Sequence, residues 1–249
     1  MSDNNQTKQK GSLSIAAIGD LHIRETDTGR LSSMLTQINQ VADVLLLCGD
    51  LTDQGAIVEA TVLADELRAC SVPVIAVLGN HDYESGVADQ LGTVLTQANV
   101  HLLDGNDMEI HGVGFVGVKG FPGGFLQYML PNWGEPEVKT FVYEGVQEAL
   151  KLESALSRME TKHKVALLHY APIRDTIVGE PLEIFPFLGS SRLEGPLNRF
   201  GVDVAFHGHA HHGTLAGHTE GKVPVFNVAL PLVRAQKNSD FFLYTLKLD

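Results

Sequence analysis

The stretch Val44-Leu45-Leu46-Leu47-Cys48-Gly49-Asp50 is a continuous apolar run that ends in a glycine and an aspartate. A run without polar alternation predicts a strand buried on both faces, which is typical of a parallel sheet covered by helices. Helix-period segments flank it at 30–40 and 56–69, and apolar runs lie at 13–19 and 72–78. This alternation of strands and helices predicts an α/β fold with a mostly parallel sheet.

The second half of the chain predicts a further sheet. Residues 121–136 are rich in glycine, proline and aromatic residues and are expected to form a long loop, and 141–160 form the longest expected helix. A shorter helix is expected at 190–200. The expected strands are 108–110, 112–119, 164–168, 202–206 and a closing set at 214–219, 223–228 and 241–248. The closing strands are expected to be antiparallel, so their directions indicate a second, mixed sheet.

Composition restricts the class of protein. The chain has 249 residues and a formal net charge of −12, which argues against non-specific nucleic-acid binding because such binding depends on Lys and Arg. We expect a disordered tail over 1–12 and a single domain over 13–249. Cys48 and Cys70 are expected to be free thiols in a reducing compartment. No signal peptide and no membrane span of about 18 apolar residues is recognised, so a cytoplasmic location is expected. The oligomeric state is left open.

Several expected strands end in residues that can bind metal ions. Asp20, Asp50, Asn80 and His169 each follow such a strand, and so does the histidine-rich run 207–212. In α/β sheets, ligands bind beyond the carboxyl ends of the strands. These positions therefore predict one shared site.

Each motif also has an ordinary structural interpretation when taken alone. Asp53 stands before an expected helix and could cap it. Gly79-Asn80 could form a polar turn. His169 could be a structural residue that follows a strand. Imidazole is, however, the commonest metal ligand at neutral pH, and it is the coincidence of the motifs that favours a site.

In chain order the motifs are Gly19-Asp20-Leu21-His22, Gly49-Asp50-Leu51-Thr52-Asp53, Gly79-Asn80-His81-Asp82, His169 and Gly208-His209-Ala210-His211. Over residues 15–211 this pattern resembles the calcineurin-like metallophosphoesterases of the small single-domain phosphodiesterase or phosphatase type. The resemblance implies a four-layer α/β/β/α sandwich of two mixed sheets flanked by helices, with a dinuclear metal centre. It also implies a metal-dependent hydrolase acting on phosphoric ester bonds.

The resemblance further implies a role for each site residue. One metal ion would be held by Asp20, His22, Asp50 and His211. The other would be held by Asp50, Asn80, His169 and His209, so that Asp50 bridges the pair. A metal-bridging hydroxide would attack phosphorus, and His81, oriented by Asp53, would protonate the leaving group. His207 and His212 fall outside the pattern and are expected to support the site or to be incidental.

The implied cofactors are two divalent or trivalent metal ions. Mixed nitrogen and oxygen ligands suit manganese, iron, zinc or cobalt better than calcium. The resemblance favours Mn²⁺ or iron, with Zn²⁺ as a further option.

The expected partner is a small-molecule phosphoester, with no membrane and no nucleic acid. Gln54 stands where the family's protein phosphatases carry a phosphate-binding Arg, and His81 stands where its lipid A-precursor pyrophosphatases carry Arg. A phosphodiesterase is therefore expected ahead of a phosphatase. Segments 121–136 and 173–191 are expected to rim the pocket. Nearby aromatic side chains could stack on a base or aryl group, or simply pack in the fold; they are Tyr83, Phe125 and Tyr170.

Two alternatives remain open. The chain could be a non-catalytic scaffold with this fold, although such a scaffold should have lost ligands or the acid, and the eight positions are all retained. It could also be a nuclease acting within a complex. Salt-dependent binding to single strands would distinguish that nuclease from a small-molecule enzyme.

Overall fold

The computed structural model describes residues 11–248. The first ten positions of the tail expected over 1–12 lie outside the described residues, and Ser12 begins the first strand. Among residues 11–248, no helix is both long and apolar enough to cross a membrane.

The first sheet contains five strands in the order β11-β1-β2-β3-β4. Strands β1 to β4 run parallel to one another, and β11 pairs with β1 in the antiparallel direction. The bounds are β1 (Ser12–Ile18), β2 (Val44–Cys48), β3 (Val74–Val77), β4 (Val100–Leu102) and β11 (Phe242–Lys247).

The second sheet contains six strands in the order β5-β6-β7-β8-β10-β9. The central strands β6, β7, β8 and β10 are parallel, and the outer strands β5 and β9 are antiparallel to their neighbours. The bounds are β5 (Asn106–Ile110), β6 (Val113–Val118), β7 (His163–Leu168), β8 (Val204–His207), β9 (Ala216–His218) and β10 (Pro224–Asn227). Both sheets are mixed, as expected.

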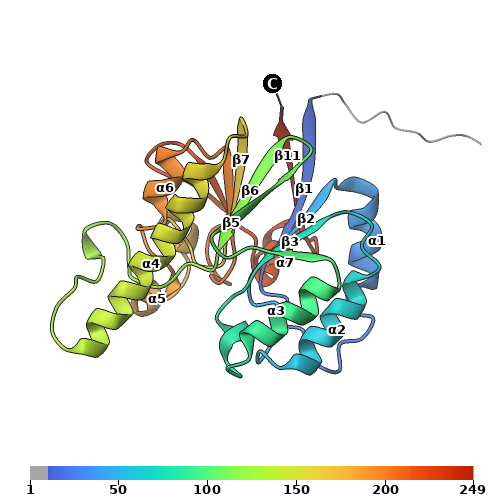
Figure 1. Ribbon diagram of the computed structural model, residues 1–249, viewed down its shortest axis with the longest axis horizontal. Coiled ribbons are helices and arrows are strands. Elements are labelled where there is room, and N and C mark those ends of the chain that lie inside the picture. The colour runs from blue at the N-terminus through green and yellow to red at the C-terminus, as the bar shows by residue number, and fades with distance from the viewer. Residues whose placement is uncertain (1–10, 249) are drawn as a thin grey trace, which may run out of the picture.

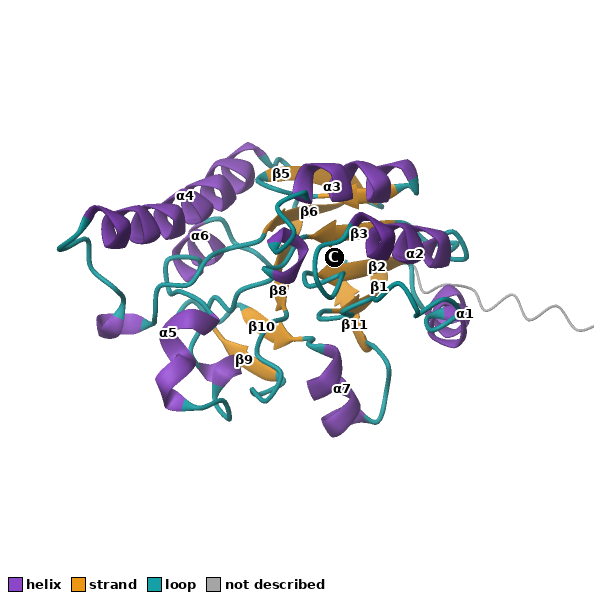
Figure 2. Ribbon diagram, turned by 90° about the horizontal axis from the view of Figure 1, so that it is seen from below, coloured by secondary structure: helices purple, strands orange, loops and turns teal. Residues whose placement is uncertain are grey.

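Helices cover the outer faces of both sheets and complete a four-layer α/β/β/α sandwich (Figures 1 and 2). On the first sheet lie α1 (Ser32–Val41), α2 (Ile57–Leu67) and α3 (Ala88–Gln97). On the second lie α4 (Pro136–Arg158) and α6 (Glu194–Arg199). The short α5 (Phe185–Leu188) and α7 (Leu230–Lys237) connect strands, and four 3₁₀ turns are η1 (His81–Tyr83), η2 (Leu126–Tyr128), η3 (Asp175–Ile177) and η4 (Leu182–Ile184).

Side-chain alternation along the strands explains why the sheets stack. In β2, Leu45 and Leu47 pack against the helices of the first sheet, whereas Val44, Leu46 and Cys48 enter a second cluster between the sheets. Successive strand residues point to opposite faces, so a fully apolar strand must be covered on both sides. The second sheet supplies that cover with residues such as Phe115, Val165 and Phe206.

Three details differ from the sequence expectation. Strand β4 and helix α7 were not expected. Strand β10 was expected among antiparallel closing strands, but it runs parallel to β8 and antiparallel only to β9. Strand direction depends on where the connecting chain crosses the sheet, and the apolar pattern of a short strand carries no such information.

Candidate metal centre

The candidate site lies where the strands of both sheets end. Asp20 follows β1, Asp50 follows β2, Asn80 follows β3, and His169 follows β7. The loop after β8 carries His209 and His211. Parallel strands place their carboxyl ends at a common edge, so segments far apart in the sequence supply side chains to one place.

Three groups of donor atoms have the spacing that a metal ion requires. In each group the ligand atoms lie within 4.8 Å of one another. The groups are Asp20 with His22 and His211, then Asp50 with His169 and His209, and finally His22 with Asp50 and His81. Asn80 joins the second group, because its Oδ1 lies 2.9 Å from Nε2 of His169.

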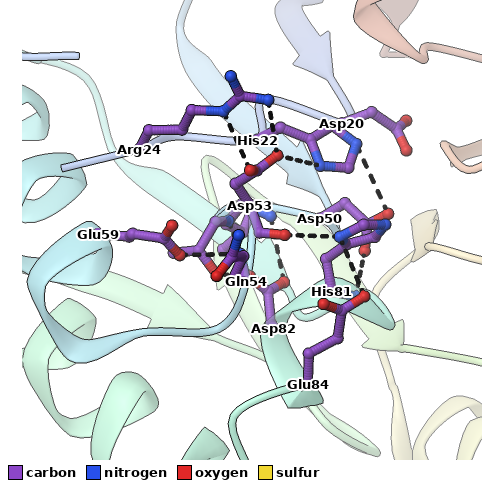
Figure 3. A network of polar contacts seen from close by, with 12 residues as sticks. Asp20, His22, Arg24, Asp50, Asp53, Gln54, Glu59, His81, Asp82 and Glu84 are labelled. Atoms are coloured by element: carbon purple, nitrogen blue, oxygen red, sulfur yellow. Dashed lines mark hydrogen bonds and ion pairs between the residues drawn. The ribbon is translucent and has the colours of Figure 1, made fainter. Parts of the chain in front are cut away.

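The carboxylates lie at the centre of these groups. Nε2 of His211 is 3.1 Å from Oδ1 of Asp20. Nε2 of His169 is 3.3 Å from Oδ1 of Asp50, and Nε2 of His22 is 3.9 Å from Oδ2 of Asp50. Asp50 therefore faces a different histidine with each oxygen (Figure 3 shows His22, Asp50 and His81 converging). This is the geometry of a carboxylate that could bridge two ions.

One buried atom in this group has no hydrogen-bond partner. Nε2 of His22 is shielded from solvent, yet it makes no hydrogen bond. Buried polar atoms in proteins are almost always paired. The donor set of carboxylates and imidazoles fits a transition-metal ion, and such an ion would satisfy this nitrogen.

In two of the histidines, one ring nitrogen lies within hydrogen-bond distance of a main-chain carbonyl. Nδ1 of His169 lies 3.1 Å from the carbonyl oxygen of Cys48, and Nε2 of His209 lies 3.2 Å from that of Phe187. Hydrogen bonds of this kind fix the ring orientation and leave the opposite nitrogen for a metal ion. The free donors would be Nε2 of His169 and Nδ1 of His209.

The backbone at the candidate ligands is unusual. Asp20, His22, Asp50 and His209 have φ values of 60°, 45°, 47° and 70°. Residues other than glycine seldom occupy this left-handed region, and such strain tends to gather at functional sites.

Two glycines of the motifs are required by close packing. A Cβ added to Gly79 would overlap the main-chain nitrogen and the carboxylate of Asp50. A Cβ added to Gly208 would overlap the carboxylate of Asp20. Both glycines thus let neighbouring loops approach closely enough to bring the donors together.

Burial determines the protonation of these groups. It lowers the pKa of His169 and of His209 to about 3, so both rings are neutral and able to bind a metal ion at pH 7. Burial, assisted by the charge of Asp50, raises the pKa of Asp20 to about 6. The hydrogen bond with Asp20 raises the pKa of His211. Two carboxylates confined in a buried site repel one another, and cations would relieve that repulsion.

His81 lies at the edge of the group. Its main-chain N–H donates to Oδ1 of Asp50 at 2.9 Å, and its Nδ1 lies 2.7 Å from the carbonyl oxygen of Asp53. Burial lowers the pKa of His81, but that hydrogen bond and the carboxylates of Asp50, Glu84 and Asp53 outweigh it, so the pKa is raised.

The carboxylate of Asp53 was expected to orient His81. In the structure that contact comes from the main-chain carbonyl of Asp53. The carboxylate instead accepts a hydrogen bond from Nε of Arg24 at 3.0 Å and lies 3.7 Å from Nδ1 of His22 (Figure 3).

Two buried residues position the loops, and the sequence reasoning missed them. Asp82 accepts hydrogen bonds from the main-chain N–H groups of Leu51, Thr52 and Gly79, and from the Thr52 hydroxyl. It thereby ties the loop after β2 to the loop after β3. Its place at the end of the Gly79-Asn80-His81-Asp82 motif was the available signal.

Asn227 at the end of β10 is the second. Its side-chain amide donates to the carbonyls of Ala210 and Thr176, and its oxygen accepts from the N–H of Ala229. Ala210 separates His209 from His211, so Asn227 anchors the histidine loop. A lone asparagine at a strand end gave no signal in the sequence.

The remaining histidines and aromatic residues are placed differently. His207 is fully buried, with Nε2 2.7 Å from Oγ1 of Thr176, and His212 is exposed. Neither belongs to a donor group among the described residues. Phe125 and Tyr170 are buried, so of the three aromatic residues considered above only Tyr83 exposes much of its ring. Tyr170 packs against the ring of His209.

A family model described as calcineurin-like phosphoesterase matches residues 13–213. The chain belongs to the calcineurin-like phosphoesterase family. It is accordingly a hydrolase of phosphoric esters, and the family acts with divalent metal ions on small phosphoester substrates. No curated protein sequence matches the chain significantly.

Solved structures share this fold. Phosphopantetheinyl hydrolase from Mycobacterium tuberculosis is 16% identical, with a TM-score of 0.66 and coverage of 93% of this chain and 95% of that one. The protein TT1561 from Thermus thermophilus is 15% identical, with a TM-score of 0.54 and coverage of 95% and 99%. A putative 5′-nucleotidase from Staphylococcus aureus is 16% identical, with a TM-score of 0.54, and covers 95% of this chain but 54% of its own. At these identities the likeness concerns the fold.

Proposed function

We propose that the protein is a dinuclear metal-dependent phosphodiesterase. The observation that carries this proposal is the position of Asp50, whose two oxygens face histidines of two donor groups. The first metal ion would be held by Asp20, His22, Asp50 and His211. The second would be held by Asp50, Asn80, His169 and His209. The unpartnered Nε2 of His22 supports the same assignment.

Two bound ions would polarise the phosphate and activate water at neutral pH. The chain's own contribution to the reaction is proton transfer. His81 has its Nδ1 engaged by the Asp53 carbonyl, and its raised pKa favours the imidazolium form. Its Nε2 is then available to give a proton to the oxygen of the departing alcohol. Asp53 and Arg24 brace the loop on which His81 depends.

The charge around the site favours a diester over a monoester. A phosphodiester carries one negative charge and a monoester up to two, so the latter profits more from a guanidinium. Gln54 supplies no charge, and Arg24 is already paired with Asp53. The buried histidines around the second group are neutral.

The test is an assay of protein loaded in turn with Mn²⁺, Fe²⁺ and Zn²⁺. Its substrates are bis-p-nitrophenyl phosphate, p-nitrophenyl phosphate, cyclic nucleotides and single-stranded DNA. We expect the diester to be hydrolysed with the higher kcat/KM, and two metal ions to be bound per chain. Turnover confined to the monoester would refute the diesterase proposal.

Two other results would assign another function. Two bound ions without turnover of any substrate would indicate a non-catalytic scaffold. Salt-sensitive cleavage of single-stranded DNA alone would indicate a nuclease.

A further inference from the structure

Exposed apolar side chains gather beside the candidate metal centre. Segment 182–187 lies beside the centre, and segment 126–128 lines a groove together with it; the two segments expose Leu126, Tyr128, Leu182, Ile184 and Phe187. We call these five residues the apolar rim. Leu182 is 69% exposed and Phe187 is 54% exposed, values that are costly for large apolar side chains in water.

The rim is a built surface rather than a loose loop. The N–H of Gly123 donates to the carbonyl of Pro186, and the N–H of Gly124 donates to that of Gly189. The N–H of Ser191 in turn donates to the carbonyl of Gly124. These main-chain bonds fix the loop that precedes η2 against α5, so the two segments present their apolar side chains together.

Two grooves run along the rim. One, of about 430 Å³, is lined by Leu126, Tyr128, Leu182 and Phe185, among others. The other, of about 420 Å³, is lined by Ile184 and Phe187 together with two candidate metal ligands, His209 and His211. The second groove thus connects the apolar rim directly with the candidate metal centre.

The rim and the centre also share a contact. The carbonyl of Phe187 lies 3.2 Å from Nε2 of His209, so the residue that exposes its ring to the groove also orients a candidate ligand. A molecule whose phosphate lies at the metal centre would therefore place a neighbouring group against Phe187 and Ile184.

We propose that the substrate is an amphiphilic phosphodiester whose apolar ester group lies in this groove. The proposal rests on the proposed function, because it assumes that the phosphate lies at the candidate metal centre. Contiguous exposed apolar patches commonly mark binding sites, and this one opens into a group of polar donors.

The charge of the surroundings favours a small amphiphile over an anionic membrane. Glu183 lies in segment 182–187, Glu180 lines the groove beside it, and the chain carries a net charge of −12. Anionic bilayers attract clusters of Lys and Arg, whereas the basic residue that lines the first groove is Arg174, which stacks over Phe185.

The experiment measures kcat/KM for methyl, butyl and hexyl p-nitrophenyl phosphate with the Mn²⁺-loaded protein, below the concentration at which the esters aggregate. A fully buried methylene is worth about fourfold in affinity, and the rim is open on one side, so we expect about twofold per methylene. The hexyl ester should then exceed the methyl ester by about thirtyfold.

Variants locate the effect. Phe187→Ser and Ile184→Ser, which alter the groove that reaches the centre, should each reduce the ratio of hexyl to methyl kcat/KM by fivefold or more. Leu150→Ser is the matched control, because Leu150 on α4 is 49% exposed and lines neither groove. Its ratio should remain that of the unaltered protein.

A binding measurement separates this proposal from the proposed function. Calorimetric titration of the Mn²⁺-loaded protein with hexyl phosphate and methyl phosphate compares the same apolar groups without turnover. Failure to hydrolyse any ester would refute the phosphodiesterase proposal. Even then, tighter binding of hexyl phosphate than of methyl phosphate, abolished by Phe187→Ser, would support an apolar binding site in the groove.

Equal kcat/KM and equal affinity across the chain lengths would overturn the inference. Sedimentation with phosphatidylcholine vesicles that Leu182→Ser abolishes, without chain-length dependence, would assign the rim to a lipid surface instead. A dimer that Phe187→Ser dissociates, again without chain-length dependence, would assign it to a second copy of this chain.

Discussion

Asn227 offers a direct test of how the second sheet supports the candidate metal centre. Its amide group is fully buried and makes three hydrogen bonds to Ala210, Thr176 and Ala229. The variant Asn227→Leu keeps the branched shape of the side chain and removes all three. We expect it to lower both the free energy of unfolding and the affinity for metal ions.

The magnitude follows from what each partner retains. The N–H of Ala229 loses its acceptor, which costs about 1–3 kcal/mol. The carbonyls of Thr176 and Ala210 still accept from Thr214 and Gly213, so each loses about 0.5–1.5 kcal/mol. The added apolar atoms return about 1–2 kcal/mol. At the middle of each range, the net loss should therefore be about 2.5 kcal/mol.

The assay is urea unfolding of the metal-free protein, followed by manganese titration. The control is Asn39→Leu, because Asn39 also makes two side-chain hydrogen bonds to the main chain, but it is only half-buried and its bonds are open to solvent. Water can replace those bonds, so the control should lose less than about 1 kcal/mol. An Asn227→Leu protein with the stability and manganese affinity of the control would refute the reasoning.

Four further predictions concern individual site residues. His81→Ala should lower kcat by about 10²–10⁴-fold on a diester with a poor leaving group while metal content is retained; unchanged turnover would contradict its role as the acid. Asp50→Ala should lose metal and activity together, as measured by metal analysis, and two retained ions would argue against a bridging carboxylate. Gly79→Ala should weaken metal binding and cost about 1–3 kcal/mol, because its Cβ would overlap main-chain and side-chain atoms of Asp50; a manganese affinity equal to that of the unaltered protein would count against this packing argument. Burial lowers the pKa of His207 to about 4, against about 6.5 when unfolded, so the unfolded chain binds more protons between these values. The contribution of His207 to the stability of the metal-free protein should therefore be complete above pH 6.5 and fall by up to about 3 kcal/mol towards pH 4, and His207→Gln should remove that part of the pH slope in urea unfolding across this range.

Much of the fold could be predicted from the sequence because buried residues recur with a different period in strands and in helices. The expected strands at 13–19 and 44–49 correspond to β1 and β2 within a residue or so. Strand β4 was missed because it has three residues, one of them exposed, too few for a pattern. Helix α7 was missed because it is short and begins soon after strand β10, so its few apolar residues show no clear helical period.

The sequence by itself determined the α/β class, the two sheets and the set of residues that the motifs place after strands, such as Asp20, Asp50 and His169. It could do so because the local pattern of apolar residues indicates which faces of each strand and helix are buried. Only the tertiary structure decided that the carbonyl, not the carboxylate, of Asp53 contacts His81. It also decided that Asn227 anchors the histidine loop. These features depend on backbone conformation and on contacts between segments distant in sequence, which no local pattern encodes.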